Sequence, residues 1–192
     1  GQPLDAAPRL VSAILTHDHL DFVGLHCHIG SQIFATDGFR ESARRLLGVY
    51  QELATLTGAP VPELNLGGGF GIAYTPSEAD ELPAIDDIAR ELADLVSETC
   101  TALGVQVPRL AFEPGRTIIG QAGITLYTVG TTKPVALAGS DACLDPADAG
   151  FAERLYVSVD GGMSDYARPA LYGADYHVRI ANRARDADPA LV

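Results

Sequence analysis

An acid and a base three positions apart, Glu113 and Arg116, are the side chains best placed to do chemistry. They share the turn Glu113-Pro114-Gly115-Arg116, which follows an apolar run, and such a run before turn residues predicts a buried strand. Charged groups at a strand's end are costly without partners, so an isolated turn of this kind would be a structural ion pair. Three other stretches share the strand-then-polar-turn pattern, and we interpret all four as walls of one site: residues 24–32, 64–72 and 159–172.

One of these stretches is a glycine run, Gly67-Gly68-Gly69-Phe70-Gly71. Glycines allow unusual backbone dihedrals and let N–H groups approach a ligand closely, so phosphate is the natural guest. The run lacks the spacing of a dinucleotide-binding loop, an acidic residue placed for a ribose, and the Lys-Ser/Thr of a P-loop. Taken alone, it is equally compatible with a tight turn that binds no ligand.

Two histidines, His26 and His28, are two positions apart and therefore lie on one face of a predicted strand. A metal site is disfavoured because the sequence offers no third ligand nearby. We expect instead a buried imidazole packed against a flat group. Ser31 and the N–H groups that follow the strand would then be available to an anion.

The last stretch places Arg168 four positions before Tyr172. Because Pro169 favours the first turn of a helix, both side chains are expected on one helical face. An arginine and a phenol together can clamp a carboxylate. The alternative is an arginine that caps a surface turn.

Helices and strands alternate through the first part of the chain. Helices are predicted at residues 5–16, 37–57 and 83–103, with Asp5 and Asp37 as caps of the first two. Strands are predicted at residues 22–28, 62–66 and 109–112. This rhythm, with short connections, is typical of a parallel α/β sheet.

The pattern changes after Arg116. Strands follow without a long helix between them, at residues 124–129 and 155–159, with a loop at residues 138–150. We therefore predict a domain boundary near residues 117–123. It separates an α/β domain at residues 1–120 from a mostly β domain at residues 121–192.

The composition is that of a globular protein and limits its partners. Hydrophobic residues make up 47% and charged residues 20% of the 192 residues. A net charge of −12 argues against nucleic acid or an anionic membrane surface as partner, and no apolar stretch approaches a membrane span. Three scattered cysteines predict neither a disulfide framework nor a zinc site, which favours a cytoplasmic setting.

Together the four stretches resemble the diaminopimelate decarboxylase family, whose members are fold-type-III pyridoxal 5'-phosphate (PLP) enzymes with an alanine-racemase-like barrel. The motifs run in the family's order and spacing from about residue 20 to about residue 183: GLHCHIGSQ, LNLGGGFGI, FEPGR and VDGGMSDYARPALY. The first three are shared with ornithine and arginine decarboxylases, and the fourth favours diaminopimelate. The resemblance implies the C-terminal part of a PLP-binding TIM (β/α)8 barrel, followed by the start of a β sandwich or barrel domain.

The resemblance also implies roles for individual residues. Glu113 would hydrogen-bond the pyridine nitrogen and keep it protonated, and His28 would stack on the ring. The cofactor site, chiefly its phosphate end, would be completed by Ser31, Gly69 and the backbone of Pro114, Gly115 and Arg116. The side chain of Arg116, with Arg168 and Tyr172, would bind the end of the substrate that does not react. No metal is implied.

Two departures from the family pattern bear on activity. The only lysine, Lys133, follows the barrel motifs and cannot be the family's Schiff-base lysine, which we expect upstream of this chain. The family's downstream Cys-Glu-Ser-Gly-Asp stretch and a later active-site tyrosine are also missing, and Tyr166-Ala167 replaces the family's usual Asn-Pro. With three βα repeats and no starting Met, the chain is expected to be an internal fragment that is inactive by itself.

For the parent enzyme the resemblance implies PLP-dependent decarboxylation of meso-2,6-diaminopimelate to L-lysine and CO₂, the last step of lysine biosynthesis. It also implies a homodimer with a shared active site. One alternative is a decarboxylase of ornithine, arginine or carboxynorspermidine on the same fold. Others are a non-catalytic homologue that serves as a binding module, and an α/β half that binds a nucleotide.

Overall fold

The computed structural model describes residues 1–136 and 153–182 of the chain. The chain divides into two compact units, Gly1–Gly123 and Ile124–Val192. The loop predicted at residues 138–150 lies outside the described residues. Within the described ranges, no helix is both long and apolar enough to cross a membrane.

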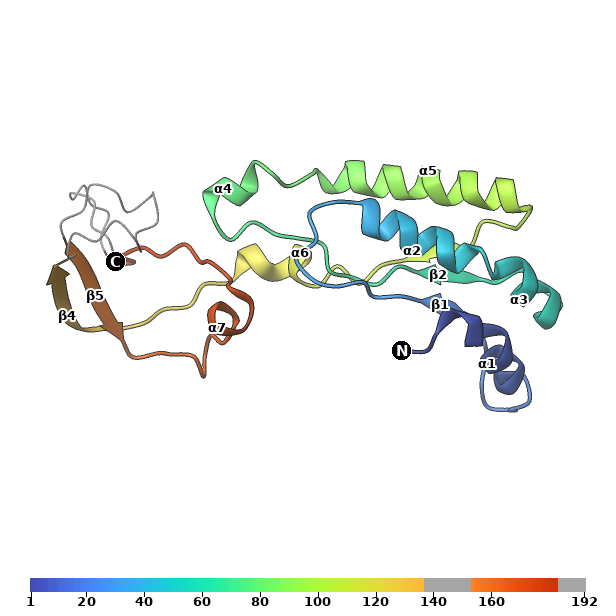
Figure 1. Ribbon diagram of the computed structural model, residues 1–192, viewed down its shortest axis with the longest axis horizontal. Helices are drawn as coiled ribbons and strands as arrows, with labels where there is room; N and C mark the ends of the chain where they lie inside the picture. The colour runs from blue at the N-terminus through green and yellow to red at the C-terminus, as the bar shows by residue number, and fades with distance from the viewer. Residues whose placement is uncertain (137–152, 183–192) are drawn as a thin grey trace. The chain divides into compact units, whose positions relative to one another are not determined.

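The first unit contains a three-stranded parallel sheet in the order β1-β2-β3 (Figure 1). Its strands are β1 (Gly24–His26), β2 (Glu63–Asn65) and β3 (Arg109–Ala111). The register places His26, Asn65 and Ala111 side by side at the carboxyl end of the sheet. Neighbouring parallel strands need a crossover connection, which the helices between them supply. The α/β class expected from the sequence is therefore confirmed.

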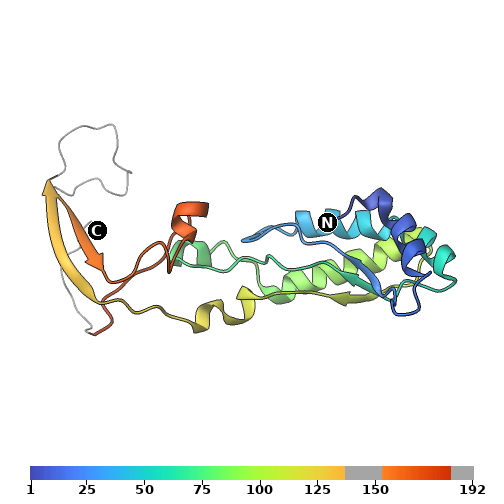
Figure 2. The ribbon, with the colours of Figure 1, turned by 90° about the horizontal axis from the view of Figure 1, so that it is seen from below.

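The helices before and between the strands are α1 (Ala7–Ile14), α2 (Asp37–Leu47), α3 (Tyr50–Thr57), α4 (Pro76–Ala79) and α5 (Ile85–Leu103). All of them except α4 contribute side chains to an apolar core against the sheet. Figure 1 shows α2 and α5 running side by side, and the two helices are in contact. α5 buries Leu92, Leu95 and Val96 in this core. Figure 2 shows the same helices from a second direction.

The prediction of one continuous helix at residues 37–57 is wrong. α2 ends at Leu47, and α3 begins at Tyr50 after Gly48 and one further residue. Glycine is a weak helix former, so the helix can break there at little cost. The break allows side chains of both segments, Leu47 and Tyr50 among them, to enter the same core.

The predicted helix caps are also wrong. Asp5 lies within the 3-10 turn Leu4–Ala6, and Asp37 is the first helical residue of α2. The residue before each helix has a helical backbone and offers no side-chain cap, whereas a capping residue needs an extended one. A complete capping box does occur at α4, where Thr75 and Glu78 bond each other's backbone, and the sequence analysis missed this helix.

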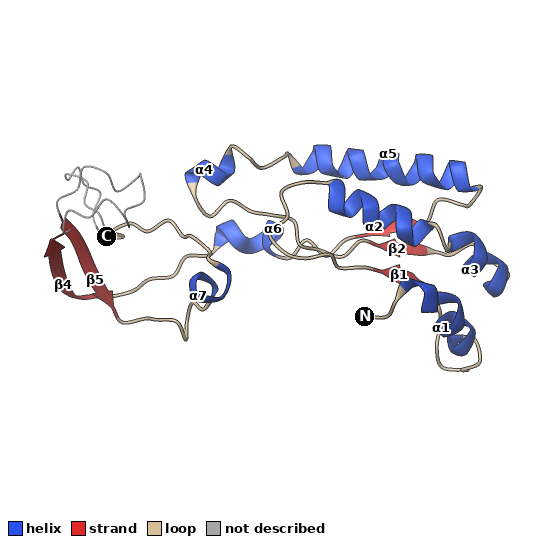
Figure 3. Cartoon of the chain, viewed as in Figure 1, coloured by secondary structure: helices blue, strands red, loops and turns tan. Residues whose placement is uncertain are grey.

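A helical turn, α6 (Arg116–Ile119), and a 3-10 turn, Gly120–Ala122, end the first unit. The second unit has an antiparallel pair, β4 (Val129–Ala136) and β5 (Glu153–Val159), and the short helix α7 (Arg168–Tyr172) (Figure 3).

In the second unit, β5 confirms the strand predicted at residues 155–159. The other strand was placed wrongly, because β4 begins at Val129, where the earlier prediction ended. The residues just before β4 are β-branched and apolar, but the strand is defined by its pairing, which runs from Val129–Val159 to Ala136–Glu153.

Candidate cofactor site

Strand alternation places the candidate side chains on the face of the sheet opposite the helices. The core packs against alternate residues of the three strand segments: Leu25 and Cys27, Leu64 and Leu66, Leu110 and Phe112. Successive side chains of a strand point to opposite faces, so His26, Asn65 and Glu113 share the other face. The same alternation that builds the core therefore gathers a histidine, an amide and a carboxylate.

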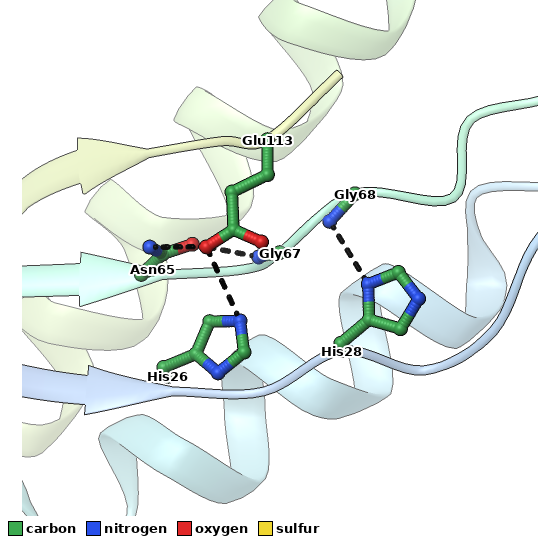
Figure 4. Close-up of polar contacts among 6 residues, drawn as sticks. All are labelled: His26, His28, Asn65, Gly67, Gly68 and Glu113. Carbon is green, nitrogen blue, oxygen red and sulfur yellow. Dashed lines mark hydrogen bonds and ion pairs between the residues drawn. The ribbon is translucent and has the colours of Figure 1, made fainter. Parts of the chain in front are cut away.

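Glu113 is held through one of its two carboxylate oxygens (Figure 4). Asn65 donates from Nδ2 to Oε1 at 3.0 Å, and His26 Nε2 lies 3.4 Å from the same oxygen. The backbone N–H of Glu113 donates to the carbonyl of Gly67 at 2.8 Å, which joins the turn after β3 to the turn after β2. Half of the Glu113 side chain, 53%, stays exposed on this face.

His28 lies beyond the end of β1 and contacts the glycine run. The expectation of a buried imidazole is wrong, because His26 and His28 are both exposed. The N–H of Gly68 donates to His28 Nδ1 at 3.3 Å, which fixes the plane of the imidazole (Figure 4). Gly68 and Gly69 leave no room for a side chain: a Cβ at Gly68 would lie 2.0 Å from the carbonyl oxygen of Glu113. At Gly69 it would lie 2.2 Å from the carbonyl oxygen of Gly30, and φ is +103° there.

Hydrogen bonds join the turn after β1 to the glycine run. Ile33 donates its N–H to the carbonyl of Gly69, and Gly71 donates back to the carbonyl of Ile33, both at 2.9 Å. The side-chain amide of Gln32 also bonds both backbone groups of Ile72, at 2.6 and 3.3 Å. These paired hydrogen bonds hold the two loops in a fixed arrangement on one side of the site.

Arg116 bridges two loops from the start of α6. It donates from Nη1 to the hydroxyl of Tyr74 at 2.6 Å and from Nη2 to the hydroxyl of Ser31. Its Cζ lies 5.8 Å from the centre of the Tyr74 ring, within range of a cation–π interaction. Among the described residues, Arg116 therefore contacts Ser31 and Tyr74, not Glu113.

In the second unit, Arg168 and Tyr172 share α7 as the sequence predicts. Arg168 Cζ lies 5.2 Å from the centre of the Tyr172 ring. The Arg168 Nε atom is buried and has no hydrogen-bond partner within the described part of the chain. In the same unit, the N–H of Thr128 donates to Asp160 Oδ1 at 2.8 Å, and this hydrogen bond lowers the pKa of the Asp160 carboxyl.

The structure thus gathers five of the residues singled out from the sequence at the carboxyl end of the sheet: His28, Ser31, Gly69, Glu113 and Arg116. The backbone of Pro114 and Gly115 lies in the same turn, between Glu113 and Arg116. Three contributors were missed: His26 as a contact of Glu113, Asn65, and Tyr74. Their alternation on the strands was a visible signal for His26 and Asn65, whereas nothing in the sequence marks Tyr74. No cluster of metal-ligating side chains occurs in the described ranges.

This geometry agrees with a family assignment. Residues 1–120 match the family model "Pyridoxal-dependent decarboxylase, pyridoxal binding domain". The chain belongs to this family. All the site residues of the first unit lie within the matched range, and the fold is that of the PLP-binding barrel domain of these decarboxylases.

Similar curated proteins are diaminopimelate decarboxylases. That of Mycobacterium tuberculosis is 46% identical over 188 residues, which are 96% of this chain and 39% of the relative. That of Corynebacterium efficiens is 42% identical over 183 residues, or 95% of this chain and 36% of the relative. The chain therefore spans less than two fifths of the length of these relatives.

Solved structures lead to the same fold. The diaminopimelate decarboxylase from M. jannaschi matches 88% of this chain and 34% of its own, with 30% identity and a TM-score of 0.68. The Helicobacter pylori enzyme complexed with L-lysine matches 96% of this chain and 39% of its own, with a TM-score of 0.71 and 22% identity. The second likeness shows the fold alone.

The residues present fit the cofactor after which the family is named. PLP offers a phosphate, a flat aromatic ring and a ring nitrogen. The site offers the closely packed glycine run of residues 67–71, which we call the glycine cradle, an imidazole at His28 that is bonded by Gly68, and a carboxylate at Glu113 with one oxygen already held. Among the described residues, the N–H groups of Gly115 and Arg116 bond no protein acceptor and are available to an anion.

Proposed function

We propose that the whole protein decarboxylates meso-2,6-diaminopimelate to L-lysine and CO₂ with PLP as cofactor, and so completes lysine synthesis. The observation that carries the proposal is the Glu113 carboxylate, held beside a glycine cradle at the end of a parallel sheet. It is supported by an identity of 39–46% to several proteins named diaminopimelate decarboxylase.

On this proposal, the first unit holds the cofactor. Glu113 accepts a hydrogen bond from the ring nitrogen and keeps it protonated, because a facing carboxylate favours the charged form. His28 packs on the ring, and its bond from Gly68 keeps the imidazole in one plane. The phosphate is received by Ser31, Gly69 and the backbone N–H groups of Gly115 and Arg116, and Pro114 lies in the same turn of the cofactor site. When bound, PLP supplies the electron sink that the departing CO₂ requires.

The distal end of the substrate is read by Arg116, Arg168 and Tyr172. Diaminopimelate differs from lysine by a second carboxylate, and only fixed polar groups discriminate such a difference strongly. Arg116 already lies in a fixed position between Ser31 and Tyr74. Arg168 lies over the face of Tyr172, which leaves its planar guanidinium suited to bidentate binding of a carboxylate.

The lysine that attaches the cofactor is supplied from outside the first unit. The chain's one lysine, Lys133, belongs to β4 in the second unit.

We also propose that the whole protein is a cytoplasmic homodimer whose active site is shared between subunits. Within the described residues, Cys27 and Cys100 are free thiols.

A substrate panel tests the proposal. The whole protein, purified and loaded with PLP, is assayed for CO₂ and product with meso-diaminopimelate, ornithine, arginine and carboxynorspermidine as separate substrates. We expect L-lysine and CO₂ in equal amounts from diaminopimelate and at least ~100-fold lower kcat/KM for the others, since each lacks a group that the site must pair. Faster turnover of another amino acid, or none of any, would overturn the proposal.

A further inference from the structure

The side-chain amide of Asn65 connects two parts of the site that are far apart in sequence. Its Oδ1 accepts the N–H of Gly67 at 2.8 Å, and its Nδ2 donates to Glu113 Oε1 at 3.0 Å (Figure 4). The orientation of the amide is fixed, because a backbone N–H only donates and a carboxylate only accepts. The Asn65 amide therefore acts as an acceptor through Oδ1 and as a donor through Nδ2.

The two oxygens of Glu113 are consequently not equivalent. Oε1 accepts a hydrogen bond from Asn65 Nδ2 and lies 3.4 Å from His26 Nε2, whereas Oε2 makes no hydrogen bond or ion pair within the described ranges. Asn65 and His26 are direct neighbours in the sheet register, so both side chains approach Oε1 from adjacent strands. Rotation of the carboxylate would break both contacts.

We infer that Asn65 and His26 are positioning residues that hold Glu113 Oε1 and leave Oε2 to accept the N–H of the cofactor ring. The inference rests on the proposed function and adds to it the means by which the carboxylate is aimed. Through Gly67, Asn65 also ties the direction of this oxygen to the glycine cradle. The carboxylate that would accept the ring N–H and the glycine run that would receive the phosphate are thereby held in a fixed arrangement relative to each other.

The charges around Glu113 are few. His26 faces it from β1, His28 contacts the N–H of Gly68, and Arg116 follows in its own turn but bonds Ser31 and Tyr74. On the neighbouring strands, Glu63 and Arg109 pair with each other at the opposite end of the sheet. The polar surroundings of the Glu113 carboxylate are therefore set chiefly by Asn65 and His26.

Asn65→Asp in the whole protein separates positioning from a merely structural role. The introduced carboxylate can still accept the N–H of Gly67, but it places a second negative charge against Glu113 Oε1. Like charges disfavour ionisation, so one carboxyl of the pair keeps its proton to a higher pH. We expect the acid limb of kcat/KM and the pH dependence of the bound cofactor's visible absorption to shift upward by at least about one unit.

The matched control is Asn182→Asp, the same change at an exposed position of the second unit. It should leave both pH profiles of the wild type unchanged. If Asn65→Asp lowers the melting temperature but keeps the wild-type profiles, the inference is wrong. If the wild-type protein itself neither binds PLP nor turns over diaminopimelate, the proposed function fails instead.

His26→Phe provides a second variant, should Asn65→Asp fail to fold. It removes the other side chain that lies within 3.4 Å of Oε1 without adding a charge, so both profiles should shift upward by less than in Asn65→Asp. We expect kcat/KM at neutral pH to fall by up to about 5-fold, the range for losing a partly exposed ion pair. His177→Phe, at an exposed position, is its control. Profiles equal to those of the control would contradict the inference.

Discussion

Arg116 donates a hydrogen bond from Nη1 to the hydroxyl of Tyr74 at 2.6 Å and lies with its Cζ 5.8 Å from the centre of the same ring. A second bond, to the hydroxyl of Ser31, fixes the other arm of the guanidinium. The three residues come from three successive strand-end loops. Arg116 is thus aimed by its neighbours and not by Glu113, three residues earlier.

Tyr74→Phe should remove the hydrogen bond that Arg116 donates to the Tyr74 hydroxyl and keep the aromatic ring that the guanidinium contacts. We expect KM for diaminopimelate to rise about 10-fold, corresponding to a lost bond of ~1.5 kcal/mol to a charged group, with the Kd of PLP nearly unchanged. Steady-state kinetics and cofactor titration of the whole protein measure both quantities. Tyr156→Phe, at an exposed position of β5, is the control. A loss confined to PLP binding would show that Tyr74 serves the cofactor instead.

Arg168→Ala should weaken the substrate far more than the cofactor. The side chain is assigned to the distal carboxylate, so we expect KM for diaminopimelate to rise at least about 10-fold, as for a lost charge-assisted bond. Arg179→Ala, an exposed arginine of the same unit, should change neither constant. If Arg168→Ala lowers substrate and PLP affinity equally, or changes neither, the clamp assignment is wrong.

Much of this site could be predicted because its signals are local. The turn at Glu113 and the glycine run each follow an apolar strand within a few residues, and strand alternation is visible in the sequence. The contact between Asn65 and Glu113 spans 48 residues, and that between Tyr74 and Arg116 spans 42. Such pairs are created by the sheet register and loop packing, which no local pattern encodes.

The errors in the fold have the same origin. A helical pattern runs through Gly48, yet the helix breaks there, and side chains of both segments are buried in one core. The start of β4 at Val129 is set by pairing with β5, although the residues before it have strand-forming side chains. Tertiary context overrode local propensity in both cases.

Gly69→Ala should damage the cradle directly. A Cβ there would lie 2.2 Å from the carbonyl oxygen of Gly30 on a backbone with φ of +103°. Such strain costs about 1–3 kcal/mol, so we expect a lower melting temperature and a Kd for PLP raised at least about 10-fold. Gly123→Ala is the control, because nothing lies within 4 Å of its added methyl group. Wild-type PLP affinity in Gly69→Ala would exclude the cradle from the phosphate site.

Asp160→Asn should change how the protein responds to acid. The N–H of Thr128 lowers the pKa of Asp160, so this carboxylate stabilises the fold above its unfolded pKa of about 3.9 and ceases to do so as the pH falls through the lower folded value. The melting temperature of the variant should therefore fall less than that of the wild type between pH 5 and pH 2 (about the range in which such groups titrate). Equal acid sensitivity in both, measured by thermal unfolding of the whole protein, would contradict the assignment.

The central claim is that Glu113 serves the ring nitrogen of PLP in a diaminopimelate decarboxylase. The most direct measurement is the rate of L-lysine and CO₂ release from diaminopimelate by Glu113→Gln, compared with the wild type and with Glu98→Gln on the exposed face of α5. We predict that kcat falls about 10- to 100-fold in Glu113→Gln and stays unchanged in Glu98→Gln, because only the first variant loses a charge-assisted hydrogen bond. A Glu113→Gln protein that releases lysine and CO₂ as fast as the wild type would contradict the claim.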